Sequence, residues 1–135
     1  MRRQHTPGVY HLVLRLARPT VLRVGRLGRF AFPAGYYVYT GSAMNGLEGR
    51  LARHRRQRKK VRWHIDYLLQ RAELVEVVPI ATRRKTECAR NGRILSLPGA
   101  EVVAPRFGSS DCRCSTHLIH FRSRPVSGRR LGNRK

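Results

Sequence analysis

The sequence predicts a small α+β domain in which a central antiparallel (or mixed) sheet is flanked by about three helices. Runs of β-branched and aromatic residues of strand length begin at residue 8, and helical periodicity appears only after residue 46. The 135 residues are 41% hydrophobic, which fits one compact domain with a small core. We expect a flexible arm at residues 1–7, the domain at residues 8–122, and a disordered basic tail at residues 123–135.

The N-terminal third is rich in strand-forming residues. GVYHLVLRLA, from residue 8, predicts a first strand, and residues 20–32 predict a second one with a bulge or turn at Gly25 and Gly28. After the turn at residues 33–35, YYVYTG is a continuous apolar run typical of a central strand. We expect these three strands to form an antiparallel meander.

A first helix is predicted over residues 47–60. Leu47 and Leu51 mark its buried side, and Arg50 and His54 lie one turn apart on another side. Few apolar residues anchor this helix, so its remaining surface is free for a charged partner.

The remaining elements are shorter. Trp63 begins a second helix, and ELVEVVPI predicts a strand in which Pro79 suits an edge position. Thr82 or Thr86 could cap a third helix that ends at about residue 97, and a short strand is expected at residues 117–121.

The charge of the chain indicates a polyanionic partner. It has 29 Lys and Arg residues against 7 acidic ones, a formal net charge of +22. Arginine binds phosphate through a planar fork, so nucleic acid, DNA rather than RNA, is the expected partner. A basic membrane-surface protein would need a helix with a clean apolar face, which the basic helix lacks. The expected phosphate contacts are Arg53, Arg55, Arg56, Arg58, Lys59, Lys60 and Arg62.

The sequence also indicates a compartment. No apolar run approaches membrane-spanning length, and the basic N-terminus has no small-residue cleavage site after its apolar stretch. The three cysteines are an odd number, so a disulfide framework is not expected. We therefore expect a cytoplasmic protein.

Two tripeptides on the predicted strands carry a resemblance. Gly8-Val9-Tyr10 and Tyr39-Thr40-Gly41 resemble the two halves of the GIY-YIG nuclease motif. Leu47, Arg50 and His54 follow in that family's order, and Glu87 on the third predicted helix matches its metal-binding glutamate. Each tripeptide alone is weak evidence, but the ordered set over residues 8–97 is strong.

The order of the whole chain narrows the resemblance. The runs GYYVYTGSA, RLARH, WHIDYLL and FGSSDCRCSTHL resemble the Uri-type, stand-alone endonuclease-like branch of the superfamily, which in some relatives lies beside DNA-repair glycosylase domains. Tyr10 and Tyr39 are farther apart than in many GIY-YIG nucleases, and an inserted hairpin at roughly residues 18–33 accounts for the gap.

The resemblance implies a metal-dependent endonuclease that hydrolyses phosphodiester bonds in DNA, with structured or damaged nucleic acid as candidate substrates. It implies that Glu87 holds one Mg²⁺ or Mn²⁺, that Arg50 binds the scissile phosphate, and that Tyr10 or Tyr39 positions or deprotonates the attacking water. His54 is a second candidate base, because the unperturbed pKa of histidine suits that role.

Each of these residues also has a structural explanation. The tyrosines could pack a core, His54 could contact phosphate, and Glu87 could form ion pairs with the bases around it. The alternative function is a non-catalytic DNA- or RNA-binding accessory module. A third candidate function is that of a protein-interaction domain whose fold is stabilised by zinc.

Two further groups of residues are open to more than one interpretation. Cys112, Cys114 and His117, with Cys88, could form a tetrahedral Cys₃His zinc site, but the spacing is unusual, and buried reduced thiols that support the loop are the favoured interpretation. His64 and Asp66 could face the catalytic site. Alternatively, Asp66 pairs with an arginine while Trp63 anchors its helix.

Overall fold

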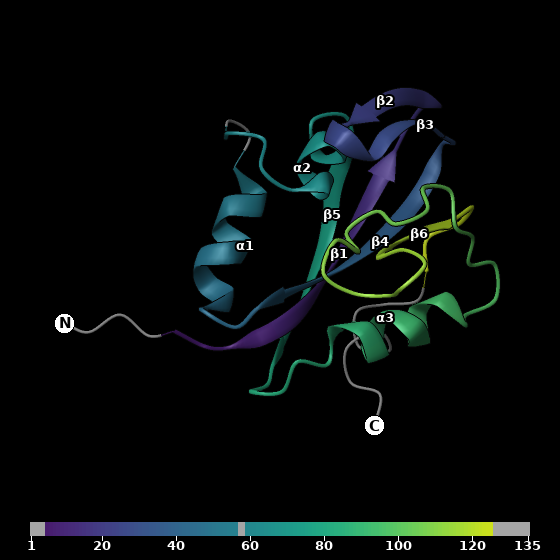
Figure 1. Cartoon of the computed structure of the whole chain (residues 1–135). Helices are drawn as coiled ribbons and strands as arrows, with labels where there is room; N and C mark the ends of the chain where they lie inside the picture. Colours follow the sequence, from purple (N-terminus) through teal and green to yellow (C-terminus); the bar gives the residue numbers. More distant parts are fainter. Residues whose placement is uncertain (1–4, 57–58, 126–135) are drawn as a thin grey trace.

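The computed structural model describes residues 5–56 and 59–125. It confirms the α+β class: a four-stranded sheet in the order β5-β1-β4-β6 carries helices on both faces, and a separate two-stranded sheet lies at one end (Figure 1). All described strand pairs are antiparallel, so the sheet is not mixed.

Two long strands form the centre of the main sheet. β1 (Gly8–Leu16) pairs along its whole length with β4 (Gly35–Ala43). β5 (Glu73–Ala81) lies at one edge and carries Pro79 there, as predicted, because an edge strand needs only one set of backbone hydrogen bonds. β6 (Leu118–Phe121) forms the other edge and pairs with the first half of β4.

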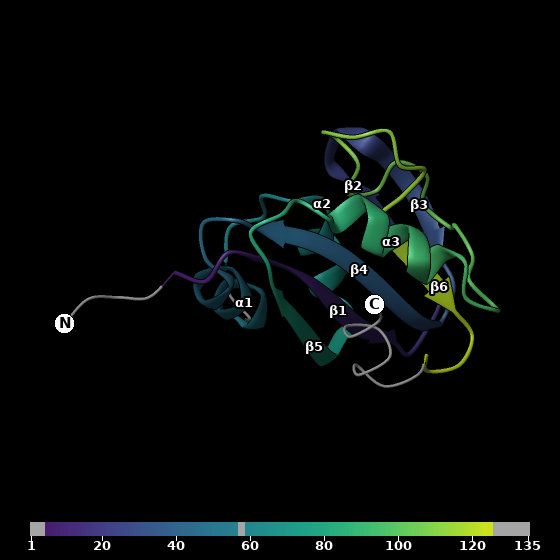
Figure 2. The ribbon, with the colours of Figure 1, turned by 90° about the horizontal axis from the view of Figure 1, so that it is seen from below.

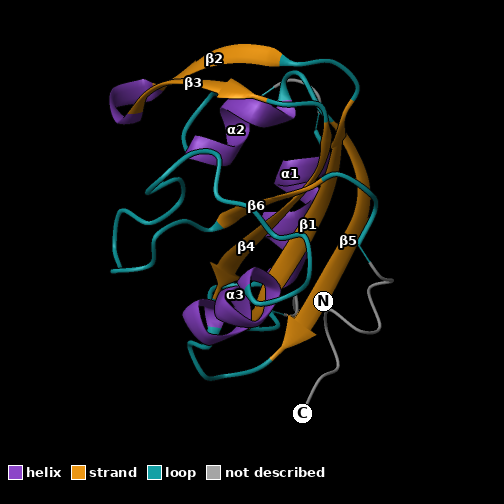
Figure 3. Cartoon of the chain, turned by 90° about the vertical axis from the view of Figure 1, so that its right-hand side faces the viewer, coloured by secondary structure: helices purple, strands orange, loops and turns teal. Residues whose placement is uncertain are grey.

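The predicted meander is wrong, whereas the inserted hairpin is confirmed. β2 (Thr20–Val24) and β3 (Gly28–Phe32) pair with each other around a short 3₁₀ turn (Gly25–Leu27), and the hairpin lies beside α2 (Figure 3). Eight of the nine residues of β1 are buried, whereas β2 and β3 alternate partly buried and exposed residues, and each buries only its last residue. β1 is therefore a central strand between β4 and β5, and the half-exposed hairpin lies outside the sheet.

The first helix is shorter than predicted. α1 (Leu47–Arg55) ends before the basic run is complete, since the backbone of Arg56 is already extended. Leu47, Leu51 and His54 form its buried side, and no apolar residue follows until Val61. Without an apolar anchor, the clustered positive charges beyond Arg55 do not continue the helix.

The other two helices agree with the sequence to within about two residues. α2 (His64–Leu69) follows Trp63, and α3 (Glu87–Leu95) follows Thr86, whose side chain makes no capping hydrogen bond.

The main sheet separates two apolar clusters. Leu12, Leu14 and Tyr37 pack on one face with α1, α2 and the hairpin. Val13 and Val38 pack on the other face with Ile94 of α3, which runs alongside β4 (Figure 2). Helices therefore approach the central strands from both sides.

The chain ends lie partly outside the described residues. Thr6, in the expected arm, donates hydrogen bonds from its backbone N–H and its hydroxyl to Glu48 at 3.1 and 2.6 Å. Most of the expected tail, residues 126–135, lies outside the described residues. No helix in the described part of the chain is long and apolar enough to cross a membrane.

Candidate active site

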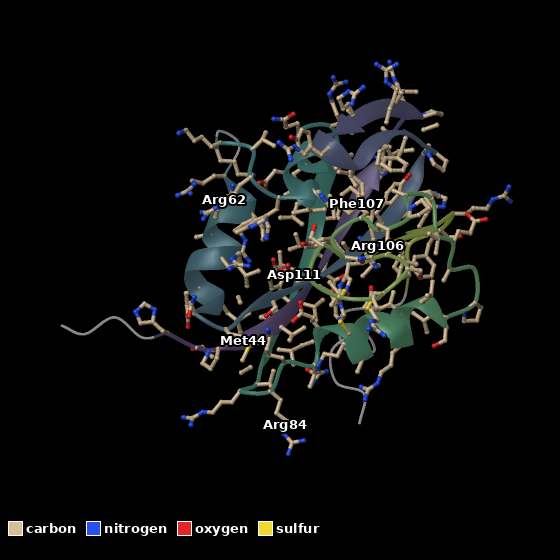
Figure 4. The ribbon with its side chains drawn as sticks, in the orientation of Figure 1. Met44, Arg62, Arg84, Arg106, Phe107 and Asp111 are labelled. Atoms are coloured by element: carbon tan, nitrogen blue, oxygen red, sulfur yellow. The ribbon has the colours of Figure 1, made fainter. Side chains whose placement is uncertain are left out.

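A cavity of about 500 Å³ opens where β4 extends beyond β6. The β6 register ends at Tyr39, so the last residues of β4 face this space with no strand beside them on that side within residues 5–56 and 59–125. Figure 4 labels two lining residues, Arg62 beside α1 and Asp111 on the loop in front of the sheet. The cavity brings together four of the five predicted catalytic residues, namely Tyr10, Tyr39, Arg50 and Glu87.

The register of the two central strands places both tyrosines in this cavity. Tyr10 lies opposite Gly41, and Tyr39 is its diagonal neighbour, with ring centroids 6.4 Å apart. A Cβ atom on Gly41 would collide with the Tyr10 hydroxyl. The glycine of the second tripeptide is therefore required because the phenol of the first tripeptide lies against its backbone.

Successive turns of α1 contact the same phenol. The Tyr10 hydroxyl lies 2.8 Å from Nε2 of His54, and the Arg50 guanidinium, one turn earlier, acts on the same hydroxyl electrostatically. Arg50 Nη1 also donates to the Ser42 carbonyl at 2.6 Å, and its Cζ lies 4.4 Å from the Trp63 ring centroid. The arginine is thus held between β4 and the indole, with other N–H groups free to bind a ligand.

Burial governs the protonation of these groups. It raises the pKa of Tyr10 to about 12, although the positive charge of Arg50 opposes the shift. Burial also raises the pKa of Tyr39 and lowers that of His54 to about 4. At neutral pH both phenols are protonated, and His54 is neutral and can accept a proton.

His54 lies behind Tyr10 and does not line the cavity. Its Nδ1 is buried and has no hydrogen-bond partner among the described residues. The hydrogen bond to Tyr10 is therefore its main polar contact inside the fold.

The seven acidic residues divide into two groups. Five are engaged within the fold: Glu48 with Thr6, Asp66 with Arg53, Glu73 with Arg15, Glu76 with Arg124, and Glu101 with His120. Glu87 and Asp111 both line the cavity, and neither has an ion pair among the residues that the structure describes. The ion-paired interpretation of Glu87 is therefore not supported, and in this strongly basic chain both of these carboxylates face one cavity.

Asp111 is a cavity residue to which sequence reasoning assigned no role. It lies in a loop without periodicity, and only its position in the lining of the cavity, with Glu87, distinguishes it. The one sequence signal for Asp111 is weak: no basic residue lies three or four positions away from it.

His64 and Trp63 also line the cavity, which extends the predicted site. The Gly108 backbone N–H donates to His64 Nδ1 at 2.8 Å, so the neutral ring carries its proton on Nε2. Desolvation lowers the pKa of His64, which favours this neutral form. Trp63 stacks against both Arg50 and Arg53, at 4.4 and 4.2 Å from ring centroid to guanidinium carbon.

Asp66 does not face the cavity. It is buried, and it accepts hydrogen bonds from Arg53 at 3.0 and 2.9 Å and from the backbone N–H groups of Arg62 and Trp63. Although burial opposes ionisation, these hydrogen bonds and the Arg53 charge hold the pKa of Asp66 below its usual range. The pairing of Asp66 with an arginine is confirmed.

The predicted phosphate contacts have different environments. Arg53 is engaged by Asp66 and by the Lys60 carbonyl. Lys59 Nζ donates to the backbone carbonyls of His54 and Arg56, at the end of α1 and just beyond it. Arg58 lies outside the described residues. Arg55, Arg56, Lys60 and Arg62 are exposed, and Arg62 also lines the cavity.

A second cluster adjoins the cavity. The ligand atoms of Cys88, Cys112, Cys114 and His117 all lie within 4.8 Å of one another, so this Cys₃His group could bind a metal ion. The three cysteines are free thiols, one exposed and two partly exposed. The expectation of buried thiols is therefore wrong, because the first turn of α3 and the irregular loop that carry the cysteines lie at the surface, where only His117 of this group is buried.

A family model described as "Domain of unknown function DUF123" matches residues 9–132. The chain belongs to this family. The match contains Tyr10, Tyr39, Arg50 and Glu87 as well as the Cys₃His group, so cavity and cluster both lie in the DUF123 domain. No curated protein and no solved structure matches the chain.

Proposed function

We propose that the cavity is the active site of a metal-dependent endonuclease that hydrolyses phosphodiester bonds in DNA. The observation that carries the proposal is the meeting of Tyr10, Arg50 and Glu87 in one cavity of a chain with a net charge of +22. The GIY-YIG resemblance implies the same residues. Phosphodiester hydrolysis needs an activated water, a cation for the phosphoryl oxygens and help for the leaving oxygen, and the cavity has side chains suited to each.

Arg50 is the proposed phosphate ligand. Its guanidinium is always charged, and its contacts with the Ser42 carbonyl and the Trp63 ring restrict its orientation. Because the arginine is already ordered, little side-chain entropy is lost when a phosphate binds. Exposed Arg62, at the same cavity, extends the positive surface along which the strand would lie.

Tyr10 and His54 form the proposed proton relay. Water attacks phosphorus and gives one proton to the Tyr10 oxygen, while the Tyr10 hydroxyl proton passes to His54 Nε2, which lies 2.8 Å away. The phenol stays neutral throughout, so the pKa of Tyr10 of about 12 is no obstacle to this route. The negative charge of Asp66 favours the imidazolium, but burial outweighs it and lowers the pKa of His54 to about 4, so the imidazolium would be short-lived and His54 would return its proton quickly.

Glu87 is the proposed ligand for one Mg²⁺ or Mn²⁺. Mg²⁺ typically binds to one or two protein carboxylates and keeps water at its other positions. Glu87 and Asp111 line the same cavity, and neither carboxylate forms an ion pair with another described residue, so this donor set fits a hard cation. When bound, the ion would stabilise negative charge on the leaving oxygen. Glu87 also lies in the first turn of α3, where the helix dipole favours a negative charge.

The experiment that tests the proposal is a cleavage assay with Mg²⁺ or Mn²⁺ on supercoiled plasmid, branched DNA and RNA. Arg50→Ala should lower single-turnover cleavage by about 10²-fold or more, the usual cost of one lost charge-stabilising donor. Arg55→Ala is the matched control, because Arg55 is exposed on the same helix and does not line the cavity. The control should lose binding affinity only.

A non-catalytic nucleic-acid-binding module is the competing function. Its specific support is the burial of the tyrosines, which are 1% and 9% exposed and leave little phenol surface open to a ligand. Salt-sensitive binding to DNA or RNA without nicking of any substrate, with either metal, would select this alternative.

A further inference from the structure

We propose that Cys88, Cys112, Cys114 and His117 bind one zinc ion, and that this ion fastens the first turn of α3 to the loop before β6. The Sγ atoms of Cys88 and Cys112 lie 3.7 and 3.3 Å from His117 Nε2, and all four ligand atoms lie within 4.8 Å of one another. Tetrahedral zinc, with bonds of about 2.3 Å to sulfur and about 2.0 Å to nitrogen, separates its ligand atoms by about 3.6–3.8 Å. The cluster thus has the dimensions of a zinc site.

His117 is already oriented as a metal ligand. Its ring is buried, and its Nδ1 lies 3.0 Å from the carbonyl oxygen of Thr40. A carbonyl can only accept a hydrogen bond, so Nδ1 carries the proton and the lone pair of Nε2 faces the sulfurs. This hydrogen bond is the outer-shell contact that fixes the tautomer of metal-binding histidines.

The loop that carries Cys112 and Cys114 is held in place by Arg106. Arg106 donates hydrogen bonds to the carbonyl oxygens of Ser109, Cys112 and Cys114 at 2.6 to 2.7 Å. The backbone of Arg106 has a φ of 67°, which non-glycine residues rarely adopt. A strained turn and three hydrogen bonds thus hold Cys112 and Cys114 next to Cys88.

The donor set identifies the ion and its role. Three thiolates and one imidazole are a common structural zinc set, whereas Mg²⁺ prefers oxygen ligands. Four protein ligands complete a tetrahedron and leave no position for substrate or water. The ion would therefore be structural, and distinct from the metal proposed at Glu87.

The position of Cys88 links the zinc to the cavity. Cys88 directly follows Glu87. The hydroxyl of the N-cap residue Thr86 accepts a hydrogen bond from the Arg90 side chain but caps no backbone N–H group of the first turn. Asn91 and Ile94 hold the second half of α3, through a hydrogen bond to the Thr116 carbonyl and through burial. A zinc bond to Cys88 would hold the first half and thereby position Glu87. This last step rests on the proposed function, whereas zinc binding does not.

Elemental analysis of the full chain, purified without chelator, tests the zinc site. We expect about one zinc per chain. The zinc content should fall by at least about tenfold in Cys114→Ser and stay unchanged in Ser115→Ala, because Ser115 is an exposed residue of the same loop. Cobalt-substituted protein should show thiolate-to-cobalt charge-transfer absorption. Reduced, folded protein without bound zinc or this absorption overturns the proposal, as does a disulfide between two of the three cysteines.

Titration with Mn²⁺, followed by electron paramagnetic resonance, tests the link to Glu87. Cys88→Ser should weaken Mn²⁺ binding by at least about tenfold, while Glu87→Gln should lose Mn²⁺ and keep its zinc. Equal Mn²⁺ affinity in the native chain and Cys88→Ser overturns the link. Bound zinc without Mn²⁺ binding or cleavage refutes the nuclease proposal alone, whereas Mn²⁺-dependent cleavage by zinc-free protein refutes the zinc proposal alone.

Discussion

The Tyr10 hydroxyl lies 2.8 Å from Nε2 of His54, although 44 residues separate the two in the chain. The contact joins a strand at the centre of the sheet to the last turn of α1. Both side chains are almost fully buried, so their proton exchange is shielded from solvent except at the cavity.

Tyr10→Phe tests this contact. The substitution removes only the hydroxyl, so the fold should persist while cleavage falls by about 10²-fold to 10⁴-fold, the usual contribution of a positioned proton acceptor. Tyr36→Phe, on β4 and outside the cavity, is the matched control and should cleave normally. Single-turnover assays compare the two variants, and unchanged cleavage by Tyr10→Phe would exclude the relay.

Acid should destabilise the protein through His54. Burial lowers the pKa of His54 from 6.5 to about 4, so between these values the unfolded chain binds a proton that the folded chain does not. Stability should therefore fall as the pH falls from about 6.5 to about 4, by about 3 kcal/mol from this residue alone. When the free energy of unfolding is measured with urea at several pH values in this range, it should depend less steeply on pH in His54→Gln than in the native chain. An identical slope would mean that His54 is not held neutral by the fold.

Much of the sheet can be predicted from local pattern. The apolar run YYVYTG, the strand from Gly8 and the edge proline Pro79 are local signals, and each lies where its pattern indicates. Strand pairing is not local. The meander was the simplest arrangement of the first three strands, but the burial of β1 on both faces favours β4 and β5 as its neighbours.

The site was only partly predictable, because it too depends on contacts between residues that are far apart in the chain. The ordered motif residues singled out Tyr10, Arg50 and Glu87, which do line one cavity. Asp111 comes from an irregular loop whose position depends on Arg106 and on the loop's packing, and no periodic pattern encodes that position. The end of α1 at Arg55 likewise reflects the absence of an apolar anchor and not helix propensity.

Two glycine substitutions should have opposite effects. A Cβ atom on Gly41 would collide with the Tyr10 hydroxyl, so Gly41→Ala should displace the phenol, abolish cleavage and cost about 1–3 kcal/mol of stability. A Cβ atom on Gly49, within α1, would meet no other atom within 4 Å, so Gly49→Ala should stabilise the protein by about 0.5–1 kcal/mol. Thermal unfolding and a cleavage assay measure both effects. Normal cleavage by Gly41→Ala would show that the position of Tyr10 does not matter.

Binding to DNA should be strongly salt-dependent. If about six phosphates are neutralised, the logarithm of the binding constant should fall against the logarithm of salt concentration with a slope near about −5. Removal of exposed Arg56 should reduce the slope by about one, whereas Arg53, which is paired with Asp66, should contribute little to it. Fluorescence anisotropy at several salt concentrations measures the slope, and a slope near zero would rule out backbone recognition.

The most direct test of the nuclease proposal compares Glu87→Gln with Glu73→Gln in single-turnover cleavage of labelled DNA at saturating Mg²⁺. Glu73 lies on β5 outside the cavity, in an exposed pair with Arg15, and is a matched carboxylate. We predict that Glu87→Gln keeps DNA binding within about twofold but loses cleavage by about 10²-fold or more, while Glu73→Gln cleaves normally. Equal cleavage by the two variants would contradict the account.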